Sequence, residues 1–296
     1  MIVTKGKELK KYITGKTAVA LGSFDAIHKG HLEIINSAVR YAKENNLSAV
    51  VQIFTVPVGA EKACINSFEK RVSILESLGV DAVVAEDFDD NFKNTSYDEF
   101  VKVYLANRYN AAAVFAGDNY RFGQGAKGDK NSLTELCEEL GIKVNIIKCL
   151  ENNGVISSTR IRQCILSGRV DEAKELMARP YSVSGTVVHG REVGRTIDFP
   201  TANINLPKGM LVPADGVYRT RVRVGENEFS GITNVGAKPT VNVDARNIET
   251  HIIGVADDLY GKEIEILFEE KIRDIKKFES IEELKKQLEE DIKSIK

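Results

Sequence analysis

The first 180 residues alternate short apolar runs with stretches of helical periodicity. The apolar runs are rich in Val, Ile and Ala, a composition typical of strands that are buried on both faces of a parallel sheet. Alternation of strand and helix along a chain implies right-handed βαβ units. We therefore predict a parallel sheet with strands at Thr17–Gly22, Ser48–Phe54, Ala82–Ala85, Ala112–Ala116 and Lys143–Lys148, and a helix over residues 31–43 after the first of them.

Three Ser-x-x-Glu sequences read as capping boxes, in which the serine precedes a helix and the glutamate lies in its first turn. Two of them fall between apolar runs of the first half. The third precedes an amphipathic stretch at the end of the chain. They predict helix starts at Ser96–Glu99, Ser132–Glu135 and Ser280–Glu283.

The periodicity changes after Arg179-Pro180. Beyond this point apolar residues recur at every second position in short segments separated by Gly and Pro, a pattern typical of an antiparallel barrel or sandwich. The clearest segments are Ser182–Val188, Val217–Val224 and Glu263–Phe268. We therefore expect an α/β Rossmann-like domain with a parallel sheet over residues 1–180, and an antiparallel β-barrel with a C-terminal helix over residues 181–296.

The composition is that of a globular protein, and 296 residues suffice for two cores. A formal net charge of −2 provides no general attraction to nucleic acid or to an anionic membrane. We expect neither a leader peptide nor a membrane span, because no apolar run has the required length. The cysteines lack the spacing of a zinc site or a disulfide framework, so we expect reduced thiols and a cytoplasmic protein; they are Cys64, Cys137, Cys149 and Cys164.

A turn with two histidines joins the first predicted strand to the first predicted helix. It reads Gly22-Ser23-Phe24-Asp25-Ala26-Ile27-His28-Lys29-Gly30-His31. Backbone N–H groups and the helix dipole attract anions at such a turn, and imidazoles three residues apart share a face in the first helical turn. A lone His-x-x-His is most often a surface feature and can also bind metal. The glycine inside the pair and the strand before it favour a phosphate site.

Two further segments of the first half carry polar groups suited to a ligand. Ile156–Arg162 has three hydroxyls before a helix that we expect to continue to about Leu166; a plain N-cap explains the hydroxyls, whereas its two arginines add phosphate-binding capacity. Ala116–Gly123 follows a predicted strand and suits a ligand loop. The G-x-G-x-x-G pattern of Gly123–Gly128 is not a dinucleotide fingerprint, because these glycines do not join a strand directly to a helix.

In the second half, Gly185–Ile204 is dense in glycine, arginine and hydroxyl groups. Thr201 and Asn203 are two residues apart, so they share one face of a strand. A Thr-x-Asn pair by itself is most often a solvated face, but two neutral oxygen ligands suit Mg²⁺ held jointly with nucleotide phosphates. The preceding loop offers backbone amides and a guanidinium to phosphate, from Gly190, Gly194 and Arg195.

Together these motifs resemble those of a known family. Residues 28–31 resemble the His-x-Gly-His signature of the nucleotidyltransferase superfamily, and Ile156–Arg162 resembles its second phosphate-binding signature. Pro200–Asn203 resembles the kinase signature of the prokaryotic bifunctional riboflavin kinase/FAD synthetase family, which the chain resembles over essentially its whole length. The resemblance implies ATP-dependent phosphorylation of riboflavin to FMN, and adenylylation of FMN to FAD with release of pyrophosphate.

The resemblance also implies partners and residue roles. The partners are riboflavin, FMN and ATP, with Mg²⁺ as cofactor and with neither nucleic acid nor membrane. In the adenylyltransferase domain it implies catalysis by His28 and His31, ATP binding by Gly22, Ser23, Phe24, His28, Gly30, His31, Ser158, Thr159 and Arg162, and FMN binding by Asp118, Asn119 and Phe54. In the kinase domain it implies ATP binding by Gly190, Arg191, Gly194, Arg195, Thr201 and Asn203, metal binding by Thr201 and Asn203, riboflavin binding by Arg273 and Glu249, and Glu249 as the catalytic base.

One segment departs from the family. Members often carry a Phe-Asp-Pro-His-Pro-like stretch where this chain has Phe54–Val58, which contains no histidine. This departure makes adenylylation the weaker of the two expected activities and leaves an enzyme with kinase activity alone as an alternative. A non-catalytic flavin or nucleotide sensor would bind its ligand without consuming ATP. A Rossmann oxidoreductase would depend on the rejected glycine pattern and would bind NAD(P)H.

Overall fold

The computed structural model describes residues 1–58, 63–189, 199–237, 246–255 and 258–294. They form two compact units, unit 1 (Met1–Ser158) and unit 2 (Thr159–Lys296). Unit 1 is built on an open parallel sheet and unit 2 on a closed barrel, so both predicted fold classes are confirmed.

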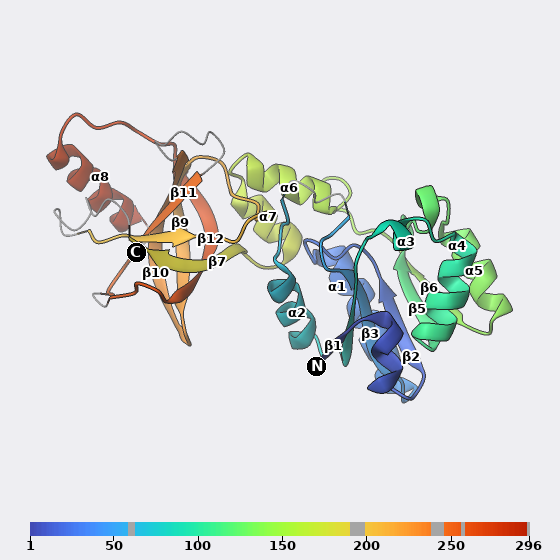
Figure 1. Ribbon diagram of the computed structural model, residues 1–296. Coiled ribbons are helices and arrows are strands. Elements are labelled where there is room, and N and C mark those ends of the chain that lie inside the picture. Colours follow the sequence, from blue (N-terminus) through green and yellow to red (C-terminus); the bar gives the residue numbers. More distant parts are fainter. Residues whose placement is uncertain (59–62, 190–198, 238–245, 256–257, 295–296) are drawn as a thin grey trace. The chain divides into compact units, whose positions relative to one another are not determined.

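The sheet of unit 1 has six strands in the order β1-β4-β3-β2-β5-β6 (Figure 1). Every neighbouring pair is parallel, as expected for strands that helical crossovers connect. The strands are β1 (Ile2–Thr4), β2 (Thr17–Leu21), β3 (Ser48–Phe54), β4 (Ala82–Glu86), β5 (Ala111–Gly117) and β6 (Lys143–Ile147).

Helices cover both faces of this sheet (Figure 1). On one face α1 and α2 pack through residues such as Ile35 and Leu75. On the other face η1, η2 and α5 pack through residues such as Leu9, Phe100 and Leu133. The helices of unit 1 are η1 (Gly6–Lys11), α1 (Lys29–Glu44), α2 (Phe68–Ser77), α3 (Asp90–Lys93), α4 (Tyr97–Glu99), η2 (Phe100–Arg108), η3 (Gln124–Ala126) and α5 (Lys130–Glu139).

The five predicted strands of unit 1 are confirmed to within one residue at each end. The patterns missed β1, because three residues are too few to show a period. Ser96 and Ser280 cap helices as predicted, accepting hydrogen bonds from the third residue beyond each of them. The predicted start at Ser132 is wrong. Asp129 precedes it and caps α5 instead, because its carboxylate accepts from two backbone N–H groups of the first turn.

Unit 2 contains a closed barrel with the strand order β10-β11-β8-β7-β12-β9, in which neighbouring strands are antiparallel. Buried and exposed positions alternate along most of β7, as expected for a strand with one face in the core. The strands are β7 (Tyr181–Val188), β8 (Ala202–Asn205), β9 (Gly216–Val224), β10 (Asn227–Ala237), β11 (Arg246–Ile252) and β12 (Glu263–Arg273).

Three further helices follow the sheet of unit 1 along the chain: α6 (Ser158–Leu166), α7 (Val170–Met177) and α8 (Ile281–Ser294). The end of α6 matches the prediction. An ion-pair group joins α7 to the barrel, because Glu269 of β12 binds both Lys174 of α7 and Arg221 of β9. Burial by itself would raise the pKa of Glu269, but the bonds from the two cations outweigh it and hold that pKa below its usual range.

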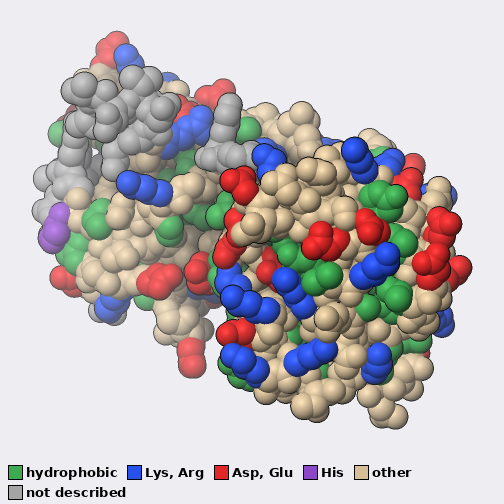
Figure 2. All heavy atoms as spheres, turned by 45° about the vertical axis from the view of Figure 1, so that its right-hand side comes forward, with side chains coloured by type: hydrophobic (Ala, Val, Ile, Leu, Met, Phe, Trp, Pro, Cys, Tyr) green, Lys and Arg blue, Asp and Glu red, His purple; other side chains and the backbone are tan. Residues whose placement is uncertain are grey.

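No helix among the described residues is both long and apolar enough to cross a membrane. On the face drawn in Figure 2, basic and acidic side chains intermingle. All four cysteines are free thiols, and Cys137 and Cys164 are buried.

Unit 1 holds a fully buried arginine, Arg71 of α2. Its two terminal nitrogens donate to the carbonyl oxygens of Phe54 and Thr55, each at 2.7 Å. Burial lowers the pKa of this guanidinium, and the nearby Asp25 carboxylate partly offsets that effect. Arg71 therefore fixes the backbone just beyond β3, where the sequence departs from the family that it resembles.

The pKa of Glu269 predicts a pH-dependent contribution to stability. A carboxyl whose pKa is lower in the folded state stabilises the fold above its unfolded pKa, and this contribution is lost as the pH falls through the folded value. We expect Glu269→Gln to lower the free energy of unfolding near pH 7. The difference from the wild type should shrink below about pH 4. Urea unfolding at both pH values checks this, and a difference that does not depend on pH would contradict it.

Replacing Arg71 should destabilise the chain. Arg71→Met keeps much of the aliphatic volume but leaves two buried carbonyl groups without donors, so we expect a loss of about 2–5 kcal/mol in the free energy of unfolding. Urea denaturation followed by circular dichroism measures the loss. Ser73→Met, an exposed position on the same helix, is the control and should change stability by less than about 0.5 kcal/mol.

Candidate active sites

The turn between β2 and α1 has an unusual backbone. Phe24 and Ile27 both have a φ of 45°, a left-handed conformation that costs energy for residues with side chains. Gly22 is required by close packing, since a Cβ there would lie 2.9 Å from the Phe24 ring. Phe24 and Ile27 are fully buried, so the surrounding core maintains this strained conformation.

His28 occupies the N-cap of α1, not the first helical turn that its spacing suggested. Its Nδ1 accepts a hydrogen bond from the backbone N–H of His31 at 3.2 Å. The proton of a neutral His28 ring therefore lies on Nε2, which can donate to an anion. The two imidazoles still share a face, since their rings stack with centroids 3.7 Å apart. Gly30 permits this arrangement, because a Cβ there would lie 3.3 Å from the His28 ring.

Residues 65–66 of unit 1 hydrogen-bond to the same turn. The buried carboxylate of Asp25 accepts from the backbone N–H of Ile65 at 2.9 Å. The Asn66 side chain donates to the carbonyl oxygen of Asp25 at 2.6 Å. These bonds fix the backbone from which His28 projects. Sequence reasoning missed both partners, since nothing near residues 65–66 marks them as neighbours of the turn.

The predicted FMN-binding residues lie at the same edge of the sheet, because β3 and β5 flank β2 and all three run in parallel. Asp118 follows β5 and accepts from the backbone N–H of Cys149 at 3.1 Å; hydrogen bonding from Cys149 lowers the pKa of Asp118. Asn119 beside it is exposed. Phe54 ends β3, and its ring packs edge-on against Phe88 and Phe92 with centroids 5.2 and 5.1 Å away.

The predicted second phosphate-binding motif forms the first turn of α6. The helix begins at Ser158, so Ser158 and Thr159 lie inside it and Ser157 precedes it. Among the described residues no partner hydrogen-bonds the buried Ser158 Oγ. Arg162 lies one turn further along. The phosphate-binding role of these residues stays a prediction from the sequence.

In unit 2, the predicted kinase residues meet across two strands. Asn203 of β8 is paired in register with Glu249 of β11, and Glu249 is also paired with Asn234 of β10. Side chains paired in this way lie on the same face of the barrel wall. The register therefore brings the Asn203 side chain beside Glu249, the base that the family resemblance implies.

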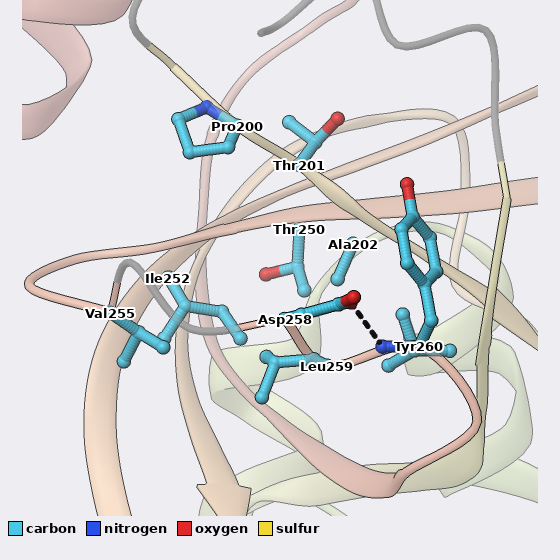
Figure 3. Close-up of a pocket in the computed structure, with 10 residues that line it drawn as sticks. Pro200, Thr201, Ala202, Thr250, Ile252, Val255, Asp258, Leu259 and Tyr260 are labelled. Carbon is cyan, nitrogen blue, oxygen red and sulfur yellow. Dashed lines mark hydrogen bonds between the residues drawn. The ribbon is translucent and has the colours of Figure 1, made fainter.

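Two cavities lie beside these strands, the larger on this face and the smaller lined by Ala202 and Thr250 of the opposite face. One of about 250 Å³ contains Glu249 and Asn234, with an apolar wall formed by Phe199, Ile275, Phe278, Leu284 and Leu288. The other, of about 160 Å³, is shown in Figure 3, where Pro200 and Thr201 lie above Thr250 and Asp258. Thr201 lines both cavities. The structure thus places this hydroxyl-bearing residue where the two cavities meet.

Arg273 also lines the larger cavity, but its guanidinium is already bound. Asp291 of α8, a buried carboxylate, accepts from Arg273 Nε at 3.1 Å and from Nη2 at 2.8 Å. Gln287 donates to the same carboxylate. Because Leu284 and Leu288 of α8 form part of the cavity wall, this ion pair fixes that wall to the barrel.

The oxygen atoms of this site suit Mg²⁺ better than a metal that prefers sulfur or nitrogen. Asn203 supplies an amide oxygen and Thr201 a hydroxyl. No group of three or more His, Cys, Asp or Glu side chains that could hold a metal occurs among the described residues. One hydroxyl and one amide oxygen fit Mg²⁺, which commonly uses few protein ligands and takes the rest from water and phosphate. The remaining predicted ATP ligands, Gly190, Arg191, Gly194 and Arg195, lie outside the described residues.

Comparison with known proteins assigns a family to each half of the chain. The family described as FAD synthetase matches residues 10–160, and the family described as riboflavin kinase matches residues 177–296. Proteins named bifunctional riboflavin kinase/FMN adenylyltransferase are similar over both units. The one from Buchnera aphidicola of Schizaphis graminum is 32% identical, with 100% of this chain and 98% of that protein covered. The one from Escherichia coli K12 is 33% identical, with 92% and 90% covered.

A solved structure titled as a macrolide-efflux protein from Streptococcus pneumoniae is also similar. It is 33% identical, with a TM-score of 0.90 and with 99% of this chain and 98% of that chain covered.

An α/β unit with a histidine turn, followed by a barrel with a Thr-x-Asn and glutamate site, defines a two-unit flavin nucleotide transferase. The chain belongs to the family of bifunctional riboflavin kinase/FMN adenylyltransferases. This membership favours two activities over the kinase-only, sensor and oxidoreductase alternatives.

Removing Asp291 should loosen α8. Asp291→Ala leaves the Arg273 guanidinium partly buried without its carboxylate, so we expect a loss of about 3–5 kcal/mol in stability and faster tryptic cleavage within α8. Limited proteolysis with mass spectrometry locates the cleavage. Glu290→Ala, an exposed neighbour, is the matched control. Equal cleavage of both variants would contradict the role of the ion pair.

Proposed function

We propose that this chain performs two consecutive ATP-dependent reactions, the phosphorylation of riboflavin to FMN and the adenylylation of FMN to FAD. The barrel carries the first reaction and the α/β unit the second. The substrates are riboflavin, FMN and ATP. The observation that carries the kinase assignment is the position of Thr201 between two cavities, one of which contains Glu249.

In the kinase step, the larger cavity takes riboflavin and the smaller one borders ATP. The apolar wall of the larger cavity suits a planar ring system, and the polar groups of Asn234 and Glu249 suit a hydroxylated chain. Glu249 accepts the proton of the ribityl 5′-hydroxyl as its oxygen attacks the γ-phosphorus of ATP. The bond from that phosphorus to the bridging oxygen breaks, and ADP leaves. Phosphoryl transfer depends mainly on positioning and charge neutralisation, so these few groups suffice.

Thr201 and Asn203 would hold the Mg²⁺ of the kinase step. When bound, the ion neutralises charge on the ATP phosphates. Asn203 lies on β8, which pairs with the strand of Glu249, and Thr201 directly precedes β8, so base and phosphates would approach from neighbouring strands. We further propose that Gly190, Arg191, Gly194 and Arg195 bind the phosphates of ATP.

In the adenylylation step, a phosphate oxygen of FMN attacks the α-phosphorus of ATP and pyrophosphate leaves. A phosphate is already a nucleophile, so no general base is needed. The stacked pair of His28 and His31 supports a role in stabilising charge on the phosphates. We propose that the ATP-binding set includes Gly22, Ser23, Phe24, Gly30, Ser158, Thr159 and Arg162, and the FMN-binding set Asp118, Asn119 and Phe54.

We assign the two functions to residues 1–180 and 181–296. The compact units divide earlier, after Ser158, and α7 contacts β12 and β7 of the barrel. We place the functional boundary later because the motif in α6 resembles a nucleotidyltransferase signature. We also propose a cytoplasmic location. The free thiols are consistent with a reducing compartment.

Single substitutions should separate the two activities. We expect His31→Ala to lower FAD formation from added FMN by about 10²–10³-fold, because it removes a donor to the transition state, while FMN formation from riboflavin persists. Glu249→Gln should lower FMN formation by about 10²–10⁴-fold and leave the adenylylation of added FMN intact. Chromatographic separation of riboflavin, FMN and FAD over time measures both rates. Equal loss of both activities in each folded variant would refute the assignment of separate sites.

A further inference from the structure

Asn247 lies two residues before Glu249 on β11, so the two side chains share a face of the barrel. Its Nδ2 donates to Glu249 Oε1 at 2.5 Å and to Asn203 Oδ1 at 3.2 Å. One amide group therefore contacts both the proposed base and a proposed metal ligand. Sequence reasoning missed this residue, and its position two before Glu249 was the available signal.

Chemistry dictates the direction of these bonds. An ionised carboxylate can only accept hydrogen bonds, and an amide NH₂ group has two hydrogens to donate. Asn247 can thus give one hydrogen to each neighbour. If its amide were reversed, its carbonyl oxygen would face the oxygens of Glu249 and Asn203, and both bonds would be lost. The two contacts therefore select one orientation of Asn247.

For Glu249 the consequence is a fixed carboxylate. Oε1 is occupied by the Asn247 bond, which leaves Oε2 to receive a proton from the substrate. Among the described residues, Asn247 alone hydrogen-bonds the Glu249 side chain. Removing this bond would let the carboxylate rotate within a cavity of about 250 Å³ and spend less time in the productive orientation.

For Asn203 the consequence is a defined amide orientation. Because Asn247 donates to it, Asn203 presents Oδ1, and not Nδ2, toward Asn247. Only the oxygen of an amide can bind a hard cation such as Mg²⁺. A partner that orients a metal ligand commonly affects metal affinity or activity by 10–100-fold, although it does not touch the ion.

We propose that Asn247 is a positioning residue of the riboflavin kinase step, which holds the catalytic carboxylate and the amide ligand in register with one side-chain amide. The proposal extends the proposed function and depends on it. In this role Asn247 orients Glu249 and Asn203 and does not bind the substrate. Its loss should therefore lower kcat more than it raises the KM for riboflavin.

The experiment compares Asn247→Ala, Asn247→Asp and Asn247→Gln with the wild type in the full chain. Asn205→Ala is the matched control, because Asn205 is an exposed asparagine two residues beyond Asn203 on β8. Thermal melting reports folding of each variant. Adenylylation of added FMN on the same chain should stay within about twofold of wild type and serves as an internal reference.

We expect Asn247→Ala to lower kcat for riboflavin phosphorylation by about 10–100-fold with less than about threefold change in KM. Asn247→Asp has nearly the same shape but offers acceptors and a like charge to Glu249, so it should lose at least as much activity. Asn247→Gln keeps the donor group and should recover part of the loss. If Asn247 served only to fill space, the aspartate variant would keep the wild-type rate, and that result would overturn the proposal.

A binding measurement tests the metal side without turnover. Mn²⁺ with ADP is titrated into each variant and followed by water-proton relaxation. Asn247→Ala should weaken binding by about tenfold, and Asn205→Ala should leave it unchanged. Unchanged Mn²⁺ affinity in Asn247→Ala would overturn the proposed orientation of Asn203.

Failure of this proposal can be told from failure of the proposed function. If Glu249→Gln still phosphorylates riboflavin at the wild-type rate, the assignment of the base is wrong. If Glu249→Gln is inactive and both Asn247→Ala and Asn247→Asp retain wild-type kcat, the base stands and only the positioning role is overturned.

Discussion

The pairing of β8 with β11 is the constraint on which the barrel site depends. Asn203 and Asn247 are separated by 44 residues of sequence, yet their side chains hydrogen-bond because the two strands pair with Asn203 opposite Glu249. In a sheet, a slip of one residue moves every side chain to the other face. Such a slip would turn Asn203 toward the barrel interior and separate it from Glu249.

A buried chain of hydroxyls stabilises the register of β11 with the strands on its other side. Thr220, Thr233 and Thr250 lie on three adjacent strands and are buried. The Thr233 hydroxyl oxygen lies 2.8 Å from that of Thr220 and 2.9 Å from that of Thr250. Buried hydroxyl groups are costly unless they are paired, so the correct register of β9, β10 and β11 is favoured over neighbouring ones. Thr250 is adjacent to Glu249 and points to the opposite face, so this interior network and the site outside it share one strand.

In the α/β unit, the candidate side chains are held in position by different interactions. There the positions are set by a strained turn and by bonds from residues distant in sequence, such as Asn66 to the carbonyl of Asp25. In both units a rigid backbone carries a few polar side chains, and the flexible part of each side chain is short. Phosphoryl and nucleotidyl transfer both rely on positioning, so the rigidity of the backbone is itself part of the proposed chemistry.

The sequence by itself determined the parallel sheet and the change to a barrel after Pro180. It also predicted His28 and His31 as candidate site residues, and its resemblance to a known family predicted Glu249. Periodicity and turn composition suffice for the two folds, because they reflect local conformation and burial of each strand. It placed His28 in the first helical turn and Ser132 at a helix start, since a pattern cannot rank competing caps.

Only the tertiary structure decided which residues meet. The bond from Asn247 to Asn203, the capture of Arg273 by Asp291, and the location of Thr201 between two cavities all join segments that are distant in sequence. Strand register and helix docking set these contacts, and both result from the packing of the whole barrel. For this physical reason, the list of candidate residues was readable from the sequence, whereas their arrangement into a site was not.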